Sequence, residues 1–157
     1  MSRRARTTTV LGDADLARRE PVWNALSTLW LDRESTPRDL AWIAGVLHAS
    51  RFSLAELRAI YLYEVAPSVH GHRRVEDGKR DAFDEPWLYG RAKRRAEHRS
   101  VWLRLCAASG FGRARMTSAT EPCWNIVVDL LERMRARAAS APACAELSRP
   151  VRDASGG

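Results

Sequence analysis

The apolar residues of this sequence recur three or four positions apart, and no long segment alternates between apolar and polar residues. One such stripe begins after Pro21 and consists of Val22, Trp23, Leu26, Leu29 and Trp30. This spacing places apolar side chains on one side of a helix, and it recurs in four later segments. The sequence therefore predicts an all-α fold, a single small helical bundle of about five helices.

Prolines and capping residues indicate where these helices begin. Proline is tolerated in the first turn of a helix because its missing N–H would have no partner there. The expected helix starts are Pro21, Pro37, Pro86 and Pro122. Capping boxes are predicted for Thr36 with Asp39 and for Ser53 with Glu56. Pro67 is expected to end the third helix and Gly110 to follow the end of the fourth.

The 157 residues are about the length of one ordinary domain. We expect a disordered basic N-terminus at residues 1–12, a helical domain at 13–139 and a disordered tail at 140–157, where Ala, Ser, Pro and Gly are frequent. A long charged loop is predicted between Ser68 and Phe83, and a basic link between Gly110 and Ser118.

Residues 19–27, REPVWNALS, are followed by LWLD at 29–32. This segment resembles a bacterial family of small proteins that carry a domain of unknown function and open with R-E-P-V-W-x-A-L-S-x-L-F-L-D. The likeness covers roughly residues 18–88 and includes FDEPWL at 83–88. No activity is established for that family, so the resemblance implies a fold and no function. The chain beyond Gly110 is expected to be an addition to the family domain.

Positive charge is the strongest chemical feature of the sequence. Lys and Arg total 26 against 19 Asp and Glu, and only two of the 26 are lysines. Part of this charge gathers on the predicted fourth helix, where arginines can neutralise phosphates and an aromatic ring can stack on a base. The candidate nucleic-acid or anion-binding residues are Arg91, Arg94, Arg95, His98, Arg99 and Trp102. The alternative is a solvated helix face packed against acidic residues of the same protein.

A second candidate site lies in the predicted charged loop and consists of His70, His72, Arg73 and Arg74. Its two histidines could bind zinc or nickel with a carboxylate from Asp77 or Asp81, but an H-x-H pair without a fixed third ligand also fits a flexible polar loop. We therefore predict neither a metal site nor a cofactor. The three cysteines lack the spacing of a zinc module or disulfide framework, and we expect a cytoplasmic protein.

The sequence contains no G-x-S-x-G motif, no phosphate-cradling glycine loop and no cysteine paired with a convergent histidine. We therefore expect a protein that is not an enzyme. Six tryptophans are many for a small bundle to bury, and a remaining aromatic patch would mark a protein partner. The first hypothesis is a bacterial protein of the immunity, accessory or regulatory type that binds another protein. The alternative is a basic nucleic-acid-binding protein, and no window is apolar enough to predict a membrane partner.

Overall fold

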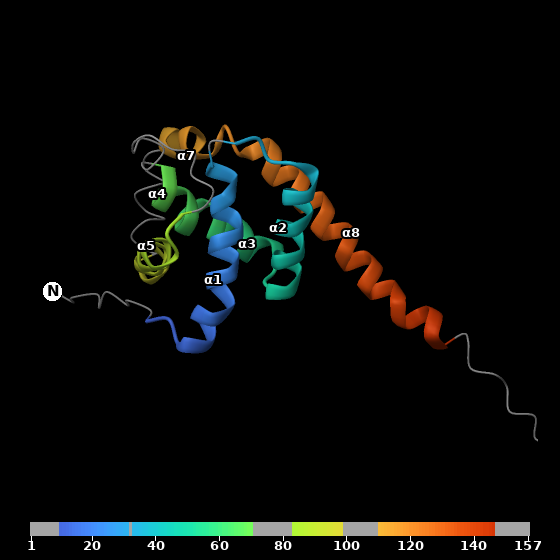
Figure 1. Cartoon of the computed structure of the whole chain (residues 1–157). Coiled ribbons are helices and arrows are strands. Elements are labelled where there is room, and N and C mark those ends of the chain that lie inside the picture. The colour runs from blue at the N-terminus through green and yellow to red at the C-terminus, as the bar shows by residue number, and fades with distance from the viewer. Residues whose placement is uncertain (1–9, 32, 71–82, 99–109, 147–157) are drawn as a thin grey trace, which may run out of the picture.

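The structure is a computed structural model, and it describes residues 10–31, 33–70, 83–98 and 110–146 (Figure 1). These residues form helices and contain no strand, which confirms the predicted all-α fold. The elements are α1 (Asp13–Ser27), the 3₁₀ turn η1 (Thr28–Trp30), α2 (Pro37–Ser50), α3 (Leu54–Ile60), the π-helical turn η2 (Tyr61–Val65), α4 (Ala66–Val69), α5 (Glu85–Glu97), α7 (Gly110–Thr117) and α8 (Glu121–Glu146).

Helix α1 occupies the middle of the bundle (Figure 1). It packs against α2 on one side and against α5 and η2 on another. Helix α2 also packs against α8, whose last turns project away from the other helices. Helix α7 contacts α4. This arrangement leaves α5 with one side on the bundle and the other in solvent.

The predicted stripe of the first helix lies in the core. All five of its members are 8% exposed or less, and Trp23 is completely buried. Three aromatic rings from separate elements continue this core. The ring of Tyr61 stacks on that of Trp124, with centroids 4.5 Å apart, and its centroid lies 5.4 Å from that of Trp30. Burial raises the pKa of Tyr61 to about 12. Aromatic packing therefore joins η1, η2 and α8.

Both predicted capping boxes are confirmed. The hydroxyl of Thr36 accepts the N–H of Asp39, and the Asp39 carboxylate accepts the N–H of Thr36 at 2.9 Å. Ser53 and Glu56 repeat this exchange. Hydrogen bonds from Arg33 and Thr36 lower the pKa of Asp39, and hydrogen bonds from Ser53 lower that of Glu56. The carboxylates are therefore held in the charged form that satisfies the helix N-termini.

The expected helix start at Pro21 is wrong, whereas Pro37, Pro86 and Pro122 each lie in the first turn of a helix. Helix α1 begins at Asp13, so Pro21 is inside it. Proline there removes the hydrogen bond to the carbonyl of Ala17. Both residues are exposed, and water can solvate that carbonyl. The acidic Asp13 and Asp15 in the first turn support the true start through the helix dipole.

The expectation that Pro67 ends the third helix is also wrong. The chain stays helical to Val69, because η2 widens the helix just before the proline. The N–H of Ala66 bonds to the carbonyl of Tyr61, five residues earlier. A wider turn of this kind accommodates a residue that has no N–H and whose ring would clash with an α-helical carbonyl. Ser68 and Val69, expected in an exposed loop, are therefore buried in α4, and Phe83 is buried as well.

Gly110 does not follow the end of the fourth helix. Helix α5 ends at Glu97, and Gly110 is the first residue of α7, so the expected link at 110–118 is largely helical. Tertiary contacts hold this segment: Trp30 Nε1 donates to the carbonyl of Met116 at 3.1 Å, and Thr117 is buried. Such contacts outweigh the low helix propensity of the segment's glycines.

The last helix is longer than expected. Helix α8 continues to Glu146, whereas the helical domain was predicted to end at residue 139. Trp124, Val127 and Leu131 of its predicted stripe are buried. Residues 136–140 are exposed and helical. The predicted disorder of residues 1–9 and 147–157 concerns parts of the chain outside the described residues.

Candidate anion-binding site

The orientation of α5 follows from its start and its apolar residues. The Asp84 carboxylate accepts the N–H of Trp87 at 3.0 Å and so caps the helix. Leu88 and Ala92, one turn apart, are completely buried against the core. Arg91 and Arg95, three residues after Leu88 and Ala92, lie beside this buried stripe and are partly buried, whereas Arg94 and His98 lie farther from it and are exposed. The local sequence thus decides which side chains of α5 reach solvent.

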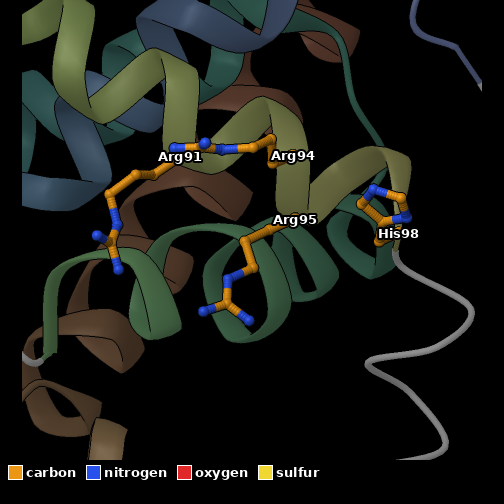
Figure 2. A pocket seen from close by; sticks show the side chains of 4 residues that line it. All are labelled: Arg91, Arg94, Arg95 and His98. Carbon is orange, nitrogen blue, oxygen red and sulfur yellow. The ribbon is translucent and has the colours of Figure 1, made fainter.

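Four of the predicted residues line one shallow pocket beside this buried stripe (Figure 2). They are Arg91, Arg94, Arg95 and His98. All four come from α5 and its C-terminal cap, and the pocket measures about 300 Å³. Arg94 and His98 are exposed, whereas Arg91 and Arg95 are partly buried. The spacing in the sequence therefore brings together three guanidinium groups and one imidazole.

An aromatic stack supports the first of these arginines. The guanidinium of Arg91 lies 5.2 Å from the centre of the Trp87 ring. That ring stacks on Phe83, with centroids 6.1 Å apart and planes at 14°. Phe83 is only 6% exposed, so the stack is anchored in the core. A cation held over an indole ring is stabilised in one position without losing its charge.

Two of the three arginines at the pocket have no acidic partner among the described residues. Within the described ranges, ion pairs join Arg19 to Glu64, Arg33 to Asp39 and Arg58 to Glu121. Neither Arg91 nor Arg94 is paired with an acidic side chain in that part of the chain. The C-terminus of α5 contributes a partial negative charge of about half a unit, which is smaller than the charge of these two guanidinium groups. The pocket is therefore suited to an anion.

The remaining predicted site residues are not brought into this pocket by the described structure. Arg99 and Trp102 lie outside the described residues, as do His72, Arg73, Arg74 and the possible carboxylate ligands Asp77 and Asp81. His70 follows α4 and is partly buried. Among the residues that the structure places, no group of three side chains could hold a metal ion.

Sequence reasoning missed a buried polar network that joins α1 to η2. Arg19 Nη1 donates to both carboxylate oxygens of Glu64, at 2.7 and 2.9 Å, and Trp23 Nε1 donates to Oε2 at 2.7 Å. Glu64 is completely buried. Its position one residue before the buried Val65, on the side of an apolar stripe, was the available signal. Because its carboxylate is saturated and has no access to solvent, this network holds the two elements together.

A model of one protein family matches residues 17–130, which is more than half of the chain. The description of that family is a domain of unknown function, DUF7079. The chain belongs to this family. The DUF7079 domain extends beyond the likeness at residues 18–88 and includes α7 and the first turns of α8. The expectation that the chain beyond Gly110 is an addition is therefore wrong as far as Leu130.

Comparisons with curated proteins and with solved structures gave no match to this DUF7079 chain. Its described helices also include none with the length and apolar character needed to cross a membrane.

Proposed function

We propose that this protein is a non-catalytic binding protein and that the arginine-lined pocket on α5 binds nucleic acid through its phosphates. The observation that carries the proposal is the pocket lined by three arginines and a histidine, two of whose arginines have no acidic partner among the described residues. Guanidinium groups bind phosphate oxygens through short, charge-assisted hydrogen bonds. Among the functions considered, phosphate binding is the one that the described structure supports most directly.

The phosphate backbone of a nucleic acid fits the site better than a small anion that needs an enclosed pocket. The pocket is shallow and lies on a helix surface, so a single small ligand would remain largely in water. Basic residues also outnumber acidic ones over the whole chain, which carries a net charge of +7. Binding that depends on many weak phosphate contacts gives affinity with little sequence specificity.

Binding to an oligonucleotide should weaken steeply as salt is added. If the site contacts four phosphates, the logarithm of the association constant should fall with the logarithm of salt concentration at a slope of about −3 to −4. Filter binding at several salt concentrations measures this slope. Arg94→Ala should reduce its magnitude by about one, because this exposed arginine would contact one phosphate.

Arg133→Ala is the matched control, because Arg133 is an exposed arginine on α8. It removes the same charge from the protein and should leave the slope close to that of the natural chain. Binding that is undetectable at low ionic strength, or that does not change with salt, would contradict the proposal. An equal change in the two variants would assign the effect to net charge and would remove the α5 site.

A protein partner is the second candidate, of the immunity, accessory or regulatory type. The specific observation in its favour is the exposure of two large apolar side chains on helices that pack together: Trp42 of α2 is 50% exposed and Ile126 of α8 is 48% exposed. Tryptophan is enriched among the residues that dominate protein interfaces. In this second proposal the partner covers Trp42.

Trp42→Ala should abolish the capture of a specific protein from a lysate of the native host without lowering the thermal stability of the chain. The stability is expected to persist because half of the side chain is already in water. Quantitative mass spectrometry compares the proteins captured by the natural chain, by Trp42→Ala and by Arg38→Ala. The last is the control, because Arg38 is an exposed residue of the same helix. Recovery of ribosomes and nucleic acid alone, by all three chains, would contradict a protein partner.

A further inference from the structure

We infer that the α5 site selects single-stranded nucleic acid, by stacking an unpaired base on the guanidinium group of Arg91. This inference rests on the proposed function and specifies its ligand. It is carried by the stack of Phe83, Trp87 and Arg91, which begins in the core and ends at the pocket. A phosphate contact of Arg94 would hold the adjoining backbone.

The aromatic rings of Trp87 and Phe83 support the side chain of Arg91. Its guanidinium lies over Trp87 at 5.2 Å, and Trp87 lies almost parallel to the buried ring of Phe83. A guanidinium group is planar and stacks on aromatic rings through its flat face. In this inference the nucleobase lies on the part of the Arg91 guanidinium that the Trp87 ring leaves uncovered. The ordering of a long side chain, which usually opposes binding, is then largely complete before the ligand arrives.

A comparison within the chain shows why this arginine differs from a purely structural one. Arg58 also lies over aromatic rings, 5.4 Å from Tyr61 and 5.5 Å from Trp124. Its guanidinium, however, donates to the Glu121 carboxylate at 2.6 Å, so its charge is compensated. Arg91 has the aromatic support without an acidic partner in the described part of the chain, and its charge remains available to a ligand.

The other two arginines of the pocket lie one turn of α5 beyond Arg91, where Arg94 can reach the phosphates next to a base stacked on Arg91. Arg94 and Arg95 are three and four residues after Arg91, or about 5 Å along the helix axis, and they line the same pocket. A base on Arg91 would therefore leave its neighbouring phosphates beside the next turn. Bases in a duplex are already stacked on one another, whereas the faces of bases in a single strand are accessible. The site consequently favours the single strand.

The experiment compares two oligonucleotides of about ten nucleotides, a range that single-strand binding sites cover. One is a single-stranded DNA, and the other is the same strand with abasic sites, which keeps the phosphates and lacks the bases. Fluorescence anisotropy at fixed low salt gives both dissociation constants. We expect the strand with bases to bind roughly 5- to 150-fold more tightly, as one or more stacked bases would contribute.

Arg91→Lys is the decisive variant, because lysine keeps the charge and lacks the planar group. It should bring the ratio of the two dissociation constants close to one while leaving the affinity for the abasic strand unchanged. Arg94→Lys is the matched control and should keep the ratio of the natural chain. Trp87→Leu should reduce the ratio as well, and if that variant does not fold, Arg91→Lys still decides.

The outcomes separate this inference from the proposal beneath it. Equal affinities of the natural chain for both strands, with a steep dependence on salt, would overturn base stacking and retain phosphate binding. A full base preference in Arg91→Lys would also overturn the inference. The absence of binding to either strand at low salt would contradict the proposed function itself.

Discussion

Replacing Trp23 by alanine is expected to lower the free energy of unfolding by roughly 3 to 5 kcal/mol. The side chain is completely buried in the middle helix of the bundle, so its removal leaves a cavity in a closely packed interior. Its Nε1 also donates to the buried carboxylate of Glu64. The loss is a large part of the 5 to 15 kcal/mol that typically stabilises a domain.

Urea denaturation followed by circular dichroism of the helices measures this change. Trp23→Phe keeps most of the ring and removes the N–H donor, so it should cost less than the alanine variant. Arg94→Ala, on the exposed side of α5, should change the free energy of unfolding by about 0.5 kcal/mol or less. If Trp23→Ala and Arg94→Ala had equally small effects, the assignment of the buried side of α1 would be wrong.

Glu64→Ala is expected to destabilise the fold by a similar amount, roughly 3 to 5 kcal/mol. Glu64 is completely buried, and the Arg19 side chain that faces it is 14% exposed. Removing the carboxylate leaves the guanidinium largely desolvated without its partner and also leaves the Trp23 N–H unpaired. The cost therefore comes mainly from what remains buried.

The double variant Arg19→Met with Glu64→Leu tests this explanation. It removes both charges and fills the space with apolar atoms, so it should unfold at a higher urea concentration than either Arg19→Met or Glu64→Leu alone. The same denaturation experiment on the four chains completes the cycle. Additive losses in the double variant would show that the two side chains do not act as a pair.

The parts of the fold that the sequence predicts are those decided within a few residues. Thr36 and Asp39 form a capping box because each satisfies the other's backbone N–H, and no distant residue is needed. The apolar spacing from Val22 to Trp30 similarly determines which side of α1 is buried. These features depend on local hydrogen bonds and helical periodicity, so they can be predicted from the sequence alone.

The errors arise where distant contacts outweigh a local signal. Pro67 lies in a helix because η2 widens the preceding turn, and the glycine-containing start of α7 is helical where Trp30 bonds to Met116. A local rule cannot include these contacts. Glu64 was missed for the same reason, since its partners Arg19 and Trp23 lie more than 40 residues away along the chain.

Part of the candidate site could likewise be predicted from local spacing, and part could not. Helical spacing is sufficient to place Arg91, Arg94, Arg95 and His98 on one side of α5. The contact between Trp87 and Arg91 also follows from a separation of four residues, but the ring of Phe83 beneath Trp87 precedes the helix. Its contribution depends on how the chain enters α5, which apolar periodicity does not describe.

The contacts made before and after the π-helical turn η2 depend on the number of residues in this part of the chain. One residue added to or removed from a helix rotates everything that follows by about 100°. Tyr61, at the start of η2, faces the aromatic rings of Trp30 and Trp124, and Glu64, near its end, faces Arg19. Both contacts hold only in the register that the wide turn sets. Substitutions here exchange one side chain for another, whereas a single insertion or deletion would turn α4 away from the partners that now bury it.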